Sequence, residues 1–181
     1  MPTLSKNSGL VKAEPLTLTF RCVTQDGFGS FSNMIFPGRH ELAGAPDDWP
    51  ETLEKGSLNC RVIDFPENFD EIAGPGRGIL KLDQGLFAPA FTIPHDAIQR
   101  NRLKPNAQEP LKGMAQVWRC VVTNETTQQT FNVFHVRRID ESSPYDGVIE
   151  LMSDKHLRCA HNLQENDGTV LRIEMQGYVQ P

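Results

Sequence analysis

Residues 16–22 read LTLTFRC, and this stretch sets the fold class. Its apolar residues alternate with polar ones, which is the period-two pattern of a strand with one buried face. The alternation stops at Asp26-Gly27, a dipeptide that is typical of turns. The sequence therefore predicts a β-strand near the start of the fold, with its apolar side against a core.

The same kind of pattern recurs along the chain. Leu58, Cys60 and Val62 alternate with Asn59 and Arg61, so the two polar residues fall on the face opposite the apolar ones. Further runs rich in Val, Phe and Ile are predicted as strands, and residues 124–129 as a hairpin loop between two of them. These runs are 87–93, 115–123, 130–136, 148–152 and 169–175.

Helix signals are few. A short helix is predicted at 154–162, with Ser153 as N-cap and with Leu157, Ala160 and Leu163 on its apolar face, and a second helix at 95–103. Short strands separated by many prolines and glycines favour a barrel over a layered α/β fold. We therefore expect a mainly β protein, a small closed or nearly closed barrel of six to seven strands with one or two short helices.

The length and composition are those of one globular domain. The chain has 181 residues, of which 38% are hydrophobic and 23% charged. Residues 1–14 are polar and lack periodicity, which predicts a flexible N-terminal arm and leaves 15–181 as a single barrel domain. The part around 66–113 is longer than a small barrel needs, and we interpret it as a central insertion.

Charge and cysteine spacing exclude several classes of protein. A formal net charge of -5 argues against a broad surface for nucleic acid or membrane, and no apolar run has the length of a membrane span or a signal peptide. We therefore expect a cytoplasmic protein. The cysteines are too far apart for a zinc ribbon or a thioredoxin-like motif, and we expect buried free thiols. They are Cys22, Cys60, Cys120 and Cys159.

Three features have chemical potential. Gly27 and Gly29 form a glycine-bearing turn after the first strand, where backbone N–H groups can approach a phosphate. Ser57 and Asn59 project from one strand face, so a hydroxyl and an amide oxygen can share one Mg²⁺. Glu150 is a lone carboxylate in an apolar run, as a general base can be. Each feature also has a structural interpretation: a hairpin turn, a strand edge and a solvated side chain.

In their order along the chain, these segments resemble the CTP-dependent riboflavin kinases, which are small cradle-loop barrels. The likeness is in the glycine turn, in Gly56-Ser57-Leu58-Asn59 and in the late strand at 148–152, followed by Leu157-Arg158 and by 166–170.

The resemblance also implies roles for single residues. Gly27 and Gly29, together with Gly56 and Ser57, would bind the nucleotide. Ser57 and Asn59 would bind Mg²⁺, and Glu150 would be the base for the riboflavin 5′-hydroxyl.

The expected activity is thus transfer of the γ-phosphate of a nucleotide, expected to be CTP, to riboflavin, with formation of FMN and dependence on Mg²⁺. Two departures from the family pattern keep other interpretations open: Cys159 follows Leu157-Arg158 where the family has Glu, and Thr169 follows Asp167-Gly168 where it has Asp. One alternative is a non-catalytic nucleotide- or flavin-binding module on the same barrel. The other is a protein-interaction domain.

Overall fold

The structure, a computed structural model, describes most of the chain. The described residues are 13–27, 34–54, 57–73, 82, 87–100, 114–138, 147–163 and 168–179. In them, none of the helices has the length and apolarity that a membrane span requires.

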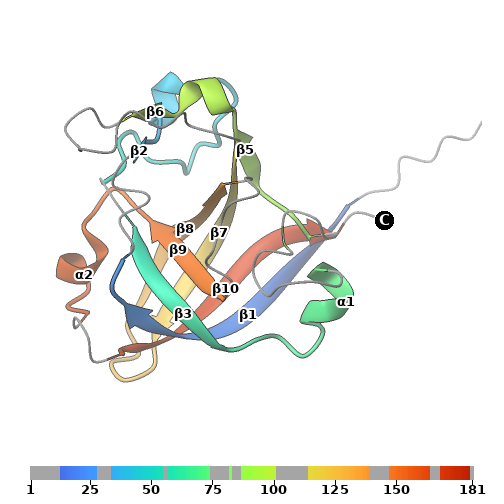
Figure 1. Cartoon of the computed structure of the whole chain (residues 1–181), viewed down its shortest axis with the longest axis vertical. Helices are drawn as coiled ribbons and strands as arrows, with labels where there is room; N and C mark the ends of the chain where they lie inside the picture. The colour runs from blue at the N-terminus through green and yellow to red at the C-terminus, as the bar shows by residue number, and fades with distance from the viewer. Residues whose placement is uncertain are drawn as a thin grey trace, which may run out of the picture.

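Six strands form the wall of a barrel in the described part of the chain. They are β1 (Glu14–Gln25), β3 (Leu58–Asp64), β7 (Ala115–Asn124), β8 (Thr130–Arg138), β9 (Val148–Met152) and β10 (Val170–Val179). Their order is β10-β1-β3-β9-β8-β7, all pairs are antiparallel, and β10 pairs with β7 to close the wall (Figure 1). This confirms the predicted mainly β barrel. Glu14, expected in the N-terminal arm, is the first residue of β1.

The interior of the barrel is filled by the apolar residues that alternate along its strands. Leu18, Phe20 and Cys22 of β1 are at most 1% exposed, and Leu58, Cys60 and Val62 of β3 are buried in the same cluster. Burying one such side chain contributes about 1.5–3 kcal/mol. The apolar residues that alternate in the sequence therefore point into the barrel, and the polar residues between them point outward.

Part of the expected central insertion packs into this interior. Phe69 lies in α1 (Phe69–Ala73), and Phe87 begins the short strand β4 (Phe87–Ala88). Phe69, Leu82 and Phe87 are at most 4% exposed and join the cluster inside the barrel. These residues contribute to the main core, and α1 is an element that the sequence pattern does not predict.

A second apolar cluster covers the outer face of β7, β8 and β9. Met34 of β2 (Met34–Ile35) and Trp49 pack over Val117 and Phe134. The Trp49 ring lies edge-on to Phe134, with 4.8 Å between ring centroids, and its Nε1 donates to the carbonyl of Pro37 at 3.0 Å. Segment 34–53 therefore forms a layer over the wall, with β2 and β6 (Gln99–Arg100) at the top of Figure 1.

The run 87–93, predicted as one strand, is two strands. Residues of β4 pair with β10, whereas those of β5 (Phe91–Ile93) pair with β7. The Ala90 N–H between them already donates to the carbonyl of Val117 on β7. Because β10 and β7 are neighbours, segment 87–93 can pair first with β10 and then with β7. Its continuous apolar pattern does not reveal this change of partner strand.

Both helix predictions are corrected in detail. The first helix is only α2 (Leu157–Ala160), because His156 caps it by accepting from the Cys159 N–H, whereas the Ser153 hydroxyl donates to Asp154. Leu157 is buried, but Ala160 is exposed. In the second, a 3₁₀ turn at His95–Ala97 leads into β6, which pairs with β2, and residues 101–103 lie outside the described part.

All four cysteines are free thiols, as expected. Cys22, Cys60 and Cys120 are buried inside the barrel, and burial raises the pKa of Cys60 and of Cys120 to about 12. Cys159 is exposed on α2, which corrects the expectation that all four are buried. The buried thiols are therefore unreactive core residues.

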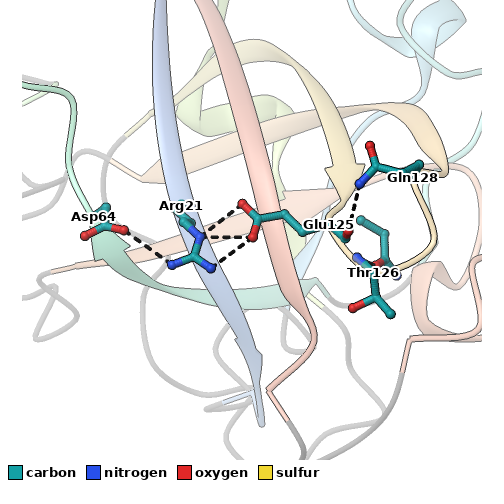
Figure 2. A network of polar contacts seen from close by, with 6 residues as sticks. Arg21, Asp64, Glu125, Thr126 and Gln128 are labelled. Atoms are coloured by element: carbon teal, nitrogen blue, oxygen red, sulfur yellow. Dashed lines mark hydrogen bonds and ion pairs between the residues drawn. The ribbon is translucent and has the colours of Figure 1, made fainter.

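A surface network ties the predicted hairpin to the barrel wall. The Nε of Arg21 on β1 lies 3.0 Å from both carboxylate oxygens of Glu125, and its Nη1 lies 3.6 Å from Asp64 (Figure 2). Inside the hairpin, Asn124 Oδ1 accepts from the N–H groups of Thr126 and Thr127. Loop 124–129 thus connects β7 and β8 as predicted and is held against β1.

Candidate functional site

Asn59 and Glu150 are direct register partners across β3 and β9. Their side chains therefore leave the wall on the same, outer face, and alternation puts Ser57 on that face too. The Ser57 hydroxyl donates to Glu150 Oε1 at 3.3 Å. The structure thus brings together the serine, the asparagine and the glutamate that the sequence pattern marks.

The glycine turn begins at the end of the neighbouring strand. Gln25, the last residue of β1, pairs with Asn59 on β3, and Gly27 follows two residues later. Gln25, Asn59 and Glu150 therefore form one row across three strands. Gly29 and Gly56, the other two expected nucleotide-binding residues, lie outside the described residues.

Asn59 is buried, although it sits on the outer face of the wall. It is 4% exposed, and its Nδ2 donates to the carbonyl of Ser57 across a long 3.5 Å. Its Oδ1 has no hydrogen-bond partner among the described residues. A buried acceptor left in this state costs about 1–3 kcal/mol. Asn59 is therefore neither an exposed strand edge nor a satisfied core residue.

Glu150 is half-buried and prefers to hold a proton. Burial raises the pKa of its carboxyl to about 8, although the hydrogen bond from Ser57 and the positive charges of Arg138 and Arg137 act in the opposite direction. At pH 7 about one tenth of the molecules carry the ionised form. The interpretation of Glu150 as a solvated side chain is therefore wrong, since the side chain is half-buried.

His135 supports the backbone of Glu150 from inside the wall. Its Nδ1 lies 3.0 Å from the Glu150 carbonyl oxygen, and because a carbonyl only accepts, Nδ1 carries the hydrogen. Burial lowers the pKa of His135 to about 4, so the ring is neutral at pH 7, and it stacks on Trp118 with 5.4 Å between centroids. Nothing in the pattern at 130–136 marks His135, since its role depends on the strand across from it.

A small cavity with basic side chains adjoins Ser57. Its volume is about 90 Å³, and its lining includes Ser57, the basic side chains of Lys155, His156 and Arg158, and the acidic side chain of Glu54. The Arg158 Nη2 donates to the carbonyl of Gln25 at 2.6 Å, so α2 reaches over to the end of β1. The cavity lies between the start of β3, the end of β9 and the segment that leads into α2. We call it the basic cavity.

The oxygens of the site suit a hard cation. No cluster of three or more His, Cys, Asp or Glu side chains placed for a metal exists in the described part of the chain. Ser57 Oγ, Asn59 Oδ1 and Glu150 Oε1 are nevertheless oxygen donors, which is the ligand type that Mg²⁺ prefers. The unpartnered Oδ1 of Asn59 is the observation that favours a cation, because a cation would satisfy it.

Comparison with known proteins finds no match for this sequence, either among the protein-family models or among the curated proteins searched. The class that fold and site define is therefore a closed antiparallel β-barrel with an oxygen-rich site on its outer wall, next to a basic cavity.

Proposed function

We propose that this protein is a Mg²⁺-dependent kinase that transfers the γ-phosphate of a nucleotide, CTP by the family resemblance, to riboflavin. The observation that carries the proposal is the convergence of Ser57, Asn59 and Glu150 on one face, with the Ser57 hydroxyl 3.3 Å from the Glu150 carboxyl. These are the residues to which the resemblance assigns the metal and the base. They are distant in the sequence, and a common face is what the activity requires.

Ser57 and Asn59 would hold the cation through Oγ and Oδ1. Bound Mg²⁺ supplies positive charge that offsets the charge of the nucleotide phosphates. In the neighbouring cavity the two cations Lys155 and Arg158 outnumber the one carboxylate, Glu54, and so favour the same anionic groups. Gly27 lies just after β1, at the same end of the strands. Because glycine has no Cβ, a phosphate can approach the backbone N–H groups there closely.

Glu150 would act on the acceptor. As a carboxylate it takes the proton of the riboflavin 5′-hydroxyl while that oxygen forms a bond to the γ-phosphorus, and the bond from phosphorus to the CDP oxygen breaks. The products are FMN and CDP, and the proton rests on Glu150. A pKa of about 8 suits this role near neutral pH, because the base must also release the proton afterwards.

The raised pKa of Glu150 also favours a second candidate, a non-catalytic module that binds nucleotide or flavin. A carboxyl that is mostly protonated at pH 7 is in the proton-accepting form in only a small fraction of molecules, and its contact with Ser57 satisfies both groups without a substrate. Such a module would bind its ligand with Mg²⁺ and release no CDP.

Product analysis and thermal shift together test the proposal. The purified protein is incubated with riboflavin, Mg²⁺ and CTP or ATP, and FMN and CDP or ADP are measured by chromatography. We expect FMN and an equal amount of nucleoside diphosphate, and a ligand-induced rise in melting temperature. A rise without FMN identifies the module, and the absence of both effects with every nucleotide removes both candidates.

A further inference from the structure

A larger groove lies on the outer wall of the barrel, beside the basic cavity. It encloses about 520 Å³, which is within the range of small-molecule sites. Gln176, Arg119 and Phe134 form one row of its floor across β10, β7 and β8, and Val121 with Asn132 forms the next. We call it the outer groove.

The walls of the outer groove are held in place by charge-assisted contacts. Arg119 binds Asp48 through two nitrogens, at 2.5 and 2.7 Å, which fixes segment 46–50 against β7. The hydrogen bond from Arg119 lowers the pKa of Asp48, so this pair stays ionised and is neutral as a unit. On the other wall, the Ser153 hydroxyl donates to Asp154 at 2.8 Å. Segment 46–50 is thus held against β7 without a ligand, which reduces the entropic cost of binding.

The lining of the outer groove disfavours an anion. Arg119 is neutralised by Asp48, and Asp154 adds a negative charge. The amides of Asn132 and Gln176 are exposed and form no hydrogen bond with the described residues. Phe134, Val121 and Val133 supply the apolar part of the lining. Two unengaged amides, a carboxylate and this apolar part match an uncharged molecule with several hydroxyl groups.

Ser153 lines both the outer groove and the basic cavity, so the two sites are neighbours with opposite preferences. We propose that the outer groove binds the uncharged, hydroxyl-rich body of the phosphate acceptor, while the basic cavity takes the anionic phosphates. This inference rests on the proposed function for the choice of acceptor. Riboflavin belongs to this class, since its ribityl chain is a neutral polyol.

Binding measurements on the full chain test the groove apart from catalysis. Riboflavin is titrated by its fluorescence and ribitol is added as competitor, with Mg²⁺ and CTP present. In the Asn132→Ala/Gln176→Ala variant we expect riboflavin affinity to fall about tenfold or more, because two hydrogen-bonding groups are lost. Gln129→Ala, an exposed amide in loop 124–129, is the matched control and should bind as the unchanged protein does.

A second measurement does not depend on the folding of a variant. The side-chain NH₂ signals of Asn132 and Gln176 in an NMR spectrum of the unchanged protein should shift when riboflavin or ribitol is added. Shifts in both, with weaker binding by the double variant, support the proposal. Equal riboflavin affinity in the double variant, or no binding of either probe to the unchanged protein, overturns it.

Failure of the proposed function gives a different result. Asn59→Ala tests the cation and nucleotide side, and by the proposed function it should abolish Mg²⁺-dependent CTP binding while riboflavin still binds. If Asn59→Ala leaves CTP binding unchanged while the double groove variant loses riboflavin, the kinase site is wrong and the outer groove stands.

Discussion

Asn59 faces Glu150 directly across β3 and β9, and the two side chains differ in how well they are satisfied. The Glu150 carboxyl accepts a hydrogen bond from the Ser57 hydroxyl, whereas the Asn59 Oδ1 has no hydrogen-bond partner in the described part of the protein. Directly opposite residues of an antiparallel pair have Cβ atoms about 4.5–5.5 Å apart. A group that completes the coordination of Asn59 would therefore also be within reach of Glu150.

Replacing Asn59 should be tolerated by the fold in the absence of ligand. In Asn59→Leu the buried, unpartnered oxygen is replaced by a methyl group on a side chain with the same branching, so we expect the free energy of unfolding without metal to stay the same or to rise by up to about 1 kcal/mol. The stabilisation by Mg²⁺ with CTP should disappear. Urea unfolding with and without these ligands measures both effects.

Asn124 provides a matched control for that measurement. It is equally buried, at 4% exposed, but its Oδ1 accepts from two backbone N–H groups. Asn124→Leu should therefore lower the free energy of unfolding by about 1–3 kcal/mol. If Asn59→Leu is as destabilising as Asn124→Leu in metal-free buffer, Asn59 has a structural partner and the cation site loses its main support.

Glu150→Gln should separate activity from stability. At pH 7 the carboxyl is mostly protonated, so an amide of the same shape replaces a neutral group and the melting temperature should change little. FMN formation should fall about 100-fold or more, because a general base typically contributes this much. Glu174→Gln, a half-buried carboxylate on β10, should retain activity. Full activity in Glu150→Gln would rule out its role as base.

The buried His135 predicts a loss of stability in acid. Its pKa is about 4 in the folded protein, below the ordinary 6.5, because burial disfavours the charged ring. The unfolded chain therefore binds a proton first as pH falls. The contribution of His135 to the free energy of unfolding is therefore complete above pH 6.5. As pH falls from 6.5 toward 4, roughly 3 kcal/mol of this free energy is lost.

Unfolding at pH 7, 5.5 and 4 measures this effect of His135. His135→Gln should show a smaller loss of stability over this range, whereas His95→Gln, at an exposed position, should lose as much as the unchanged protein. Parallel pH curves for the unchanged protein and His135→Gln would mean that other groups cause the acid sensitivity.

The Arg21–Glu125 contact should stabilise the protein weakly and in a salt-dependent way. Both side chains are accessible to water, with 47% and 33% of their surface exposed, and such pairs contribute little. Arg21→Ala and Glu125→Ala should each lower the melting temperature slightly. The coupling energy between the two substitutions, measured with the double variant, should vanish in 1 M NaCl, because the Debye screening length is then only about 3 Å. A coupling that persists at high salt would contradict an exposed ion pair.

Local patterns predict the wall of the barrel well. Alternation locates β1, β3, β7, β8, β9 and β10, because each strand puts its apolar residues on one side regardless of its neighbours. The short elements are less visible. The change of partner between Ala88 and Phe91, and the choice of His156 over Ser153 as cap, depend on contacts with residues elsewhere in the chain.

For the candidate site, the sequence by itself predicted that Ser57, just before β3, and Asn59 lie on one face, since residues two apart in a regular strand point to the same side. Only the tertiary structure decided that Glu150 lies opposite Asn59 and that His135 contacts the Glu150 carbonyl from inside the barrel. It also decided that Ser153 lines both the basic cavity and the outer groove. These relations come from the pairing register of β3, β9 and β8. Register is set by the packing of the whole core, which no single stretch of sequence contains.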